Sequence, residues 1–262
     1  MAPVVQAQDL PFQNGEELNY TIRYKYGLVV MKAGTARYRL NTAIYNQKQA
    51  LKSSLDFKTT SFFDKVLMIR DTLTAYAGMP DLTPLYHNRS VNEGSSHYTE
   101  EMWIRKHGDA YTEVSVKRMK ADVVRIDTII SVKNLGYDFL NVFLYVQNMD
   151  YSRWNTGDIR QLTTFMGDRK ANIIIRYAGQ AILEKGDNLK YNTFRLTIDI
   201  TDEAFAESKN AMEVWISNDE NHIPLKLKAK LKIGAAEAEV SSYKNLKYPL
   251  TSEIRLHGNN TH

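Results

Sequence analysis

Residues 225–233 limit what this chain can fold into more than any other segment. Apolar residues occupy every second position from Leu225 to Ile233, and the positions between them are lysines. Successive side chains of a β-strand point to opposite faces, whereas a helix repeats every ~3.6 residues. The strict alternation therefore predicts a strand with one buried face and one solvated face. It indicates no particular chemistry.

The next residues predict a hairpin. Gly234-Ala235 suits a two-residue type II′ turn, because glycine tolerates the positive φ that this turn requires at its first central position. Such a turn places Lys232 opposite Glu237 on one face and Leu231 opposite Ala238 on the other. The opposed charges stabilise the wet face, and the buried leucine sets the register. We therefore expect the substitution Leu231→Lys to unfold the domain.

Composition excludes several classes of protein. The 262 residues are 43% hydrophobic, which is typical of a folded chain, and no apolar run approaches the ~20 residues that span a bilayer. The net charge of +4 comes with lysines spread along strands, which predicts a solvated face and no nucleic-acid partner. The absence of cysteine rules out disulfides, thiol catalysis, cysteine-ligated zinc and a lipobox anchor. We expect no cofactor and no transmembrane segment.

The first residues resemble the end of a secretory signal. Val5-Gln6-Ala7 carries small residues at the two positions that a signal peptidase recognises, although no charged region and no adequate apolar region precede it. We interpret residues 1–11 as a signal-peptide remnant or a flexible terminus. Together with the absence of cysteine, this predicts a periplasmic or otherwise exported protein that can associate peripherally with the cell envelope.

The remaining chain predicts one β domain over residues 12–250 and a C-terminal tail over 251–262. Apolar and polar residues alternate through short segments, and turn-forming residues separate these segments without a Pro-, Gly- or Ser-rich linker. We predict roughly fifteen strands, near 18–26, 34–40, 51–57, 69–77, 85–91, 97–105, 111–119, 123–132, 159–166, 171–177, 191–200, 211–217, 225–233 and 237–246. Residues 61–67 are interpreted as one helical turn or a loop plug.

Residues 137–149 break the strand pattern. Tyr137, Leu140 and Leu144 fall on one helical stripe, and Phe143 lies beside it. A helix that is apolar over most of its circumference must be buried on more than one side. The predicted fold is therefore mainly β, with a large antiparallel sheet curled into an open or half barrel around this one central helix.

Three blocks of sequence resemble a known family. They are Phe12-x-x-Gly15-Glu16-x-Leu18-x-Tyr20 with Gly34-x-Ala36, Asp138-Phe-Leu-x-x-Phe-Leu-Tyr145 with Gly157-Asp158, and Val214-Trp-Ile-Ser-x-Asp219-x-x-x-Ile-Pro-Leu225 with Gly234. In this order and spacing they are similar to the domain-of-unknown-function-3108 family of exported bacterial proteins. The resemblance implies an open antiparallel barrel similar to the Lol-type carriers, which shuttle lipidated proteins between membranes. It implies no catalytic residues, because the family has no established activity.

Histidine, serine and acidic residues offer only weak candidate chemistry. Four histidines could in principle bind a metal: His87, His97, His107 and His222. Their spacings match no zinc motif, so we expect surface histidines and no metal site. Ser217, Asp219 and His222 supply the residue types of a catalytic triad, but within a single turn that Asp219 is better placed to cap. Glu16 and Glu17 are adjacent on a strand and point to opposite faces. We predict no catalytic residue.

The aromatic residues give the best candidate binding site. The chain has 16 tyrosines and 9 phenylalanines. Seven aromatic residues converge if the helix packs on the sheet as predicted: Tyr20, Tyr24, Tyr38, Phe57, Phe139, Phe143 and Trp215. They either fill the barrel as core or line a groove for an acyl chain or another apolar ligand. The sequence does not separate a filled barrel from a hollow one.

These features predict a non-enzymatic binding or carrier protein of the cell envelope, whose partner is a lipid or another apolar or amphipathic small molecule. Two alternatives stay open. An enzyme of envelope polysaccharide or lipid metabolism would show converging carboxylates with perturbed pKa values in a polar pocket. An edge-strand interaction module would show a long unpaired strand edge or a flat apolar patch.

Overall fold

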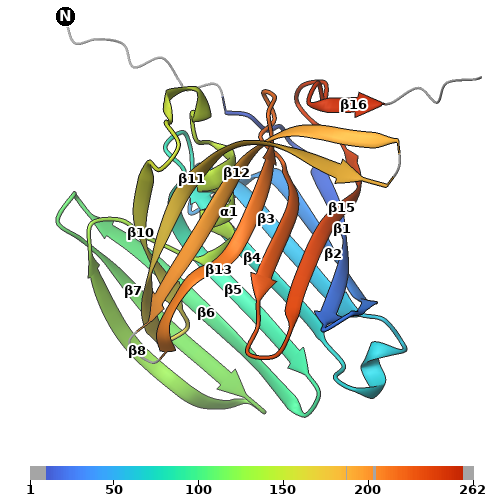
Figure 1. Ribbon diagram of the computed structural model, residues 1–262. Helices are drawn as coiled ribbons and strands as arrows, with labels where there is room; N and C mark the ends of the chain where they lie inside the picture. Colours follow the sequence, from blue (N-terminus) through green and yellow to red (C-terminus); the bar gives the residue numbers. More distant parts are fainter. Residues whose placement is uncertain (1–9, 187, 203–204, 256–262) are drawn as a thin grey trace, which may run out of the picture.

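The computed structural model describes residues 10–186, 188–202 and 205–255. The alternating segments of the sequence form one sheet of β-strands, which encloses a single α-helix (Figure 1). The strands are β1 (Glu16–Tyr26), β2 (Val29–Tyr45), β3 (Lys48–Thr59), β4 (Arg70–Gly78), β5 (Thr83–Glu93), β6 (Ser96–His107), β7 (Tyr111–Lys120), β8 (Val123–Lys133), β9 (Gly136–Tyr137), β10 (Ile159–Met166), β11 (Arg169–Lys185), β12 (Leu189–Asp202), β13 (Phe205–Ser217), β14 (Pro224–Lys230), β15 (Ala235–Lys244) and β16 (Glu253–Arg255). The helices are η1 (Phe63–Lys65), α1 (Phe139–Gln147) and η2 (Tyr151–Arg153).

The sheet is nearly closed into a barrel. Its strands follow the order β8-β7-β6-β5-β4-β3-β2-β1-β15-β14-β13-β12-β11-β10-β9, and β16 adds to β12. Every pair is antiparallel except β9 with β10. A twisted sheet of this width curls on itself, and here its two edges approach each other and leave one seam (Figure 1). The predicted fold, an antiparallel sheet curled around one helix, is confirmed.

Apolar packing closes one part of the seam. β9 follows β8 almost directly along the chain and pairs with β10. Gly136 of β9 is required by packing, because a Cβ atom here would lie 2.2 Å from the ring of Phe165. Phe165 projects from β10 onto the inward side chains of β6, β7 and β8. This contact joins the two edges, although no ladder links β8 to β10 in the described part of the chain.

The helix α1 lies inside the barrel and contacts two of its walls. Asp138 caps the helix, since its Oδ1 accepts hydrogen bonds from the backbone N–H groups of Leu140 and Asn141 at 3.0 and 3.1 Å. Leu140 and Leu144 pack with β1–β4, whereas Val146 packs with β10–β13. The predicted helix and its burial on more than one side are therefore confirmed.

The helix divides the barrel into two halves. One row of directly opposed inward residues from β1 to β7 runs across the end of the sheet where α1 packs, and it consists of Glu16, Leu40, Ser53, Ala75, His87, Met102 and Val116. No member of this row exposes more than 3% of its surface. We call the part of the barrel filled by this row and α1 the closed half. The open half is the part toward the loops that follow β1, β5 and β14.

The hairpin of β14 and β15 exists, but its predicted register is wrong. Glu237 lies opposite Lys228, four residues along the strand from its predicted partner Lys232. The loop has four residues, from 231 to 234, and Leu231 within it is 48% exposed rather than buried. Gly234 closes this loop against β1, because a Cβ at this position would lie 2.2 Å from a backbone oxygen of that strand. A shift by an even number of residues keeps every strand side chain on its predicted face.

The ends of the chain add to the core. Leu10, in the segment predicted to be flexible, is buried in the main hydrophobic cluster. β16 lies in the predicted C-terminal tail, and η1 supplies a helical turn in the predicted segment 61–67. The predicted signal remnant over residues 1–9 and the tail from residue 256 lie outside the described residues. No helix in the described ranges is long and apolar enough to cross a membrane.

Candidate functional site

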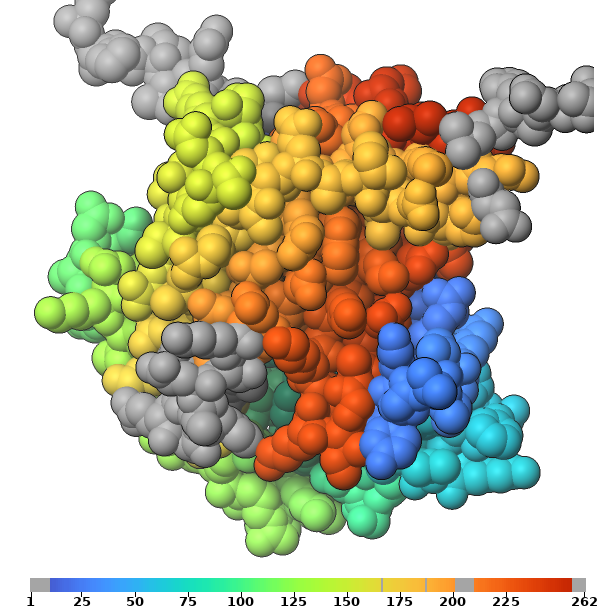
Figure 2. All heavy atoms as spheres, viewed as in Figure 1, coloured from blue at the N-terminus to red at the C-terminus, as the bar shows by residue number. Residues whose placement is uncertain are grey.

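The inward side chains of the open half are partly exposed, unlike those beneath α1. One row of opposed inward residues begins with Leu18 and Tyr38, which are 0% and 1% exposed, and continues to Leu55, Leu73 and Arg89, which are only half-buried. Solvent therefore reaches the inner face of β3, β4 and β5. We call this hollow the lumen, and Figure 2 shows an opening between the orange strands and the green strands below them.

Much of the lumen wall is apolar. Six inward residues are hydrophobic and partly buried: Ile22, Phe57, Leu73, Ile200, Met212 and Leu227. They come from β1, β3 and β4 on one side and from β12, β13 and β14 on the other. Walls of this kind are typical of sites for apolar ligands.

A charged cluster interrupts this wall on β5, β6 and β7. Arg89, Glu100 and Arg118 stand next to one another in a single inward row, and Tyr98 lies beside them. The guanidinium carbons of Arg89 and Arg118 lie 5.3 and 5.1 Å from the centre of the Tyr98 ring, within the range of cation–π attraction. Arg89 also donates a hydrogen bond to the Tyr98 hydroxyl.

The two arginines of the cluster differ in their ionic partners. Arg118 Nε donates to Glu100 Oε2 at 2.7 Å, and Arg118 Nη2 lies 3.5 Å from Asp168 in the loop between β10 and β11. This contact crosses the seam and fastens it. Arg89 forms no ion pair within the described part of the chain, and its Nε is buried without a hydrogen-bond partner there.

Two carboxyl groups lie close to Arg89. Burial raises the pKa of Glu93, a hydrogen bond and the charge of Asp71 raise it further, and the charge of Arg89 lowers it. Asp71 accepts a hydrogen bond from the backbone N–H of Asn92 at 2.9 Å. The Glu93 carboxyl group therefore holds its proton more readily than an isolated carboxyl group does.

The aromatic residues predicted to form a binding site are distributed over both halves. Tyr38 and Phe143 pack together in the closed half with ring centres 4.6 Å apart. Tyr20 is buried, and its hydroxyl donates to the backbone oxygen of Pro224 at 2.9 Å. These three rings fill the interior as core. The structure brings them together but does not place them in the lumen.

The other four predicted residues lie apart from one another. Phe57 contributes to the lumen wall, and Tyr24 lies edge-on to the ring of Phe63 in η1. Phe139 is 51% exposed at the start of α1. Trp215 is half-buried on β13, with the Nζ of Lys226 5.9 Å from its ring centre.

Sequence reasoning missed Arg89, Tyr98 and Arg118. A signal for Arg89 was present, because it has the same strand parity as Leu85 and Val91, the apolar residues at the two ends of the predicted strand. Placing the apolar face of the predicted strand at 85–91 would have put Arg89 inside. The interpretation of charged strand residues as solvated is wrong at Arg89, which lies on the inner face.

The histidine and serine candidates take structural roles. His87 is buried rather than exposed as predicted, with its Nδ1 3.3 Å from Asp138 Oδ1. Asp219 caps its turn as predicted and accepts a hydrogen bond from Ser217 Oγ at 2.9 Å. The Nδ1 of His222 lies 3.1 Å from the backbone oxygen of Gln147. Among the described residues, no group of three His, Cys, Asp or Glu side chains is placed to hold a metal ion.

Glu16 is a buried carboxyl group at the other end of α1. Gln147 Nε2 donates to its Oε1 at 3.3 Å, and its Oε2 has no partner among the described residues. Burial raises the pKa of Glu16 to about 7, although the hydrogen bond from Gln147 opposes this shift. Glu16 thus links the end of the helix to β1 and is protonated over much of the acidic range.

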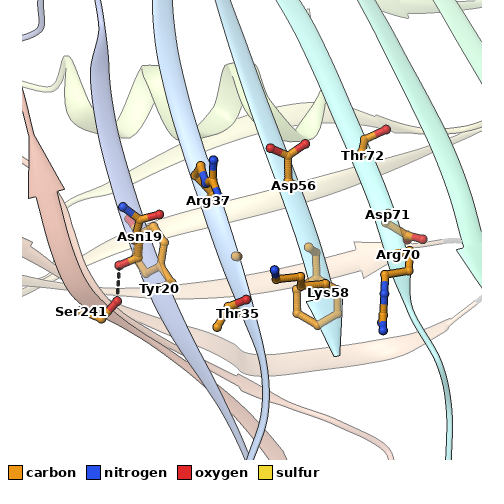
Figure 3. A pocket seen from close by; sticks show the side chains of 12 residues that line it. Asn19, Tyr20, Thr35, Arg37, Asp56, Lys58, Arg70, Asp71, Thr72 and Ser241 are labelled. Atoms are coloured by element: carbon orange, nitrogen blue, oxygen red, sulfur yellow. Dashed lines mark hydrogen bonds between the residues drawn. The ribbon is translucent and has the colours of Figure 1, made fainter. Parts of the chain in front are cut away.

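A second depression, of about 480 Å³, lies on the outer face of β1–β4 (Figure 3). Its outward side chains include Arg37, Asp56, Lys58, Arg70 and Thr72. Two of these charges are already neutralised, since Asp56 pairs with Arg39 and Arg70 pairs with Asp64. This outer groove has the polar side chains of a solvated strand face, so we assign the candidate site to the lumen.

The fold and the lumen define a barrel-like β protein with a partly hollow interior. The chain matches the family model described as "Protein of unknown function (DUF3108)" over residues 19–241, and it belongs to that family. The family resemblance of the sequence is thus confirmed. A search of curated proteins gives no match.

Among solved structures, the chain is similar to a β-barrel-like protein of domain of unknown function DUF1849 from Brucella abortus. The TM-score is 0.61 at 10% sequence identity, and the match covers 89% of this chain and 99% of that chain. At this identity the likeness bears on the fold alone.

Proposed function

We propose that this protein is an exported, non-enzymatic binding or carrier protein, which holds an apolar or amphipathic envelope ligand such as a lipid in its lumen. The supporting observation is the partial exposure of inward apolar side chains in the open half. Protein interiors are normally close-packed, and each Å² of apolar surface removed from water contributes about 25 cal/mol. An acyl chain in the lumen would recover this contribution.

Binding of a neutral apolar fluorophore, N-phenyl-1-naphthylamine, tests this function. We expect fluorescence enhancement at micromolar protein and competition by envelope lipid extract. Leu73→Asp places a charge on the apolar wall and should weaken binding by at least about tenfold. The matched control is Thr72→Asp, which adds the same charge to the outward face of the same strand. Equal binding by both variants, or none by the wild type, would contradict the proposal.

The exported location is a separate part of the proposal. It is supported by the cleavage-like Val5-Gln6-Ala7 and the absence of cysteine. Fractionation of cells that produce the protein should recover it, processed, from the envelope or periplasm. Recovery of unprocessed protein from the cytoplasm alone would count against export without bearing on ligand binding.

A second candidate function, an interaction module, is favoured by β8. This strand pairs with β7 on one side, and its other side carries no ladder in the described part of the chain. Ile129 on its outward face is 62% exposed. An open strand edge is a template for a strand from another chain. Self-association that Ile129→Lys abolishes, with fluorophore binding unchanged, would support this second function.

A further inference from the structure

Arg89 is a half-buried cation on the inner face of the lumen, and Glu93 is close enough for the charge of Arg89 to lower its pKa. The register fixes its side chain on the inner face, between Leu73 of β4 and Glu100 of β6. Its guanidinium forms no ion pair within the described ranges, and its Nε is buried without a partner there. Holding a half-buried charge unpaired is costly, so the protein alone leaves this site incomplete.

Tyr98 fixes the position of this charge. Its hydroxyl accepts a hydrogen bond from Arg89, and its ring lies against the guanidinium groups of both arginines. Arg118 is neutralised by Glu100 and Asp168, and Glu100 is almost fully buried. In this row Arg118 is held by its ion pairs, whereas the Arg89 guanidinium is held in a defined place by Tyr98 and forms no ion pair within the described residues.

The neighbouring carboxyl groups limit the charge that a ligand can bring. Glu93 and Asp71 lie near Arg89, and Glu100 lies beside it in the row. A dianion would be repelled by these groups. A monoanion can pair with Arg89, because the Glu100 carboxylate already forms an ion pair with Arg118.

An apolar track starts at the same point. Leu73 stands directly opposite Arg89, and Leu55 stands directly opposite Leu73. Neighbouring strands are about 4.8 Å apart, so these two side chains extend an apolar surface roughly 10 Å from the charge. A charged head with a long apolar tail matches this surface in both chemistry and order.

We infer that Arg89, positioned by Tyr98, binds the head group of a long-chain monoanion whose tail lies along Leu73 and Leu55. This inference rests on the proposed function and gives its ligand a chemical class. The carboxylate of a fatty acid and the phosphodiester of a monoanionic lysophospholipid share this chemistry.

Displacement of N-phenyl-1-naphthylamine by three amphiphiles tests the inference: dodecanoate, lysophosphatidylglycerol and neutral 1-dodecanol. We expect at least one anion to displace the fluorophore from the wild type about tenfold more effectively than dodecanol, an advantage that should shrink at high salt. The anion that competes better identifies the source of the head group. Arg89→Gln should remove the advantage, Arg89→Lys should retain part of it, and Arg37→Gln on the outer face should leave it unchanged.

The outcomes separate this inference from the proposed function. If dodecanol and both anions compete equally in the wild type, the lumen binds apolar chains and the head-group site is wrong. If the fluorophore does not bind at all, both proposals fail. The comparison of the three amphiphiles uses the wild type alone. It therefore tests the inference even if circular dichroism shows that Arg89→Gln is misfolded.

Discussion

The two halves of the barrel are built from the same strands, but their inward side chains differ in solvent exposure. In the closed half, the row from Glu16 to Val116 is buried beneath α1, and even its polar members are shielded from water. In the open half, the next row contains half-buried Leu73 and Arg89. The strands and their twist are common to both halves, so the helix makes the difference. A helix of nine residues fills one half and leaves the other to solvent.

The largest test of this comparison is the removal of core volume from the helix. Leu144 is buried against β1–β4, so Leu144→Ala should lower the free energy of unfolding by about 2–5 kcal/mol. Leu73→Ala in the open half should cost less than half as much, because that side chain is already partly hydrated. Urea titration measures both. Equal losses would mean that the two halves are packed alike.

A smaller effect is expected from the pH dependence of the closed half. Burial raises the pKa of Glu16 to about 7 from an ordinary value of 4.5, so the folded protein holds a proton that the unfolded chain releases. The contribution of this proton to the free energy of unfolding is fully present below pH 4.5. It falls by roughly 3 kcal/mol as the pH rises to 7. Glu16→Gln should abolish this slope. Glu17→Gln, on the opposite face, should preserve it; a wild type with flat stability from pH 4.5 to 7 would show that Glu16 is hydrated.

The seam gives the next test. Gly136→Ala forces a methyl group to within 2.2 Å of the Phe165 ring, and such overpacking costs about 1–3 kcal/mol. At Gly78 the added Cβ would meet its nearest neighbour, Leu85, at an ordinary 3.5 Å, so Gly78→Ala is the matched control. Thermal unfolding should distinguish the two variants. If they unfold at the same temperature, the edges are not in tight contact.

The smallest effect is expected at the β14–β15 loop. Leu231 is 48% exposed, so Leu231→Lys should change the free energy of unfolding by no more than about 0.5 kcal/mol. This reverses the expectation from the sequence, which placed Leu231 in the core. If circular dichroism shows that Leu231→Lys is unfolded, Leu231 is a core residue and the predicted two-residue turn with its register is correct.

The sequence predicted well the features that depend on local periodicity. Alternation at Leu225 and Leu227 gave the strand faces, and the all-round apolar character of residues 139–147 gave a buried helix. The hairpin register was not predictable in this way. The loop of this hairpin lies against β1, where Gly234 approaches Lys25, and a local pattern does not report a contact between segments more than two hundred residues apart in the chain.

The candidate site was less predictable for the same reason. Strand parity places Phe57 and Arg89 on the inner face, but no local pattern tells how far along each strand α1 reaches. The helix covers Tyr38 and leaves Leu55, its direct cross-strand neighbour, partly exposed. Whether an inward residue is core or lumen is thus decided by a tertiary contact.

The strand order also governs when the barrel can form during synthesis. Strands β1 to β8 are consecutive hairpins that can zip together as they emerge from the ribosome. The outer edge of β1, however, stays unpaired until β15 has been synthesised, because Ala236 of β15 pairs with Tyr24. The nascent chain therefore keeps two bare edges for most of its translation and closes only when nearly complete.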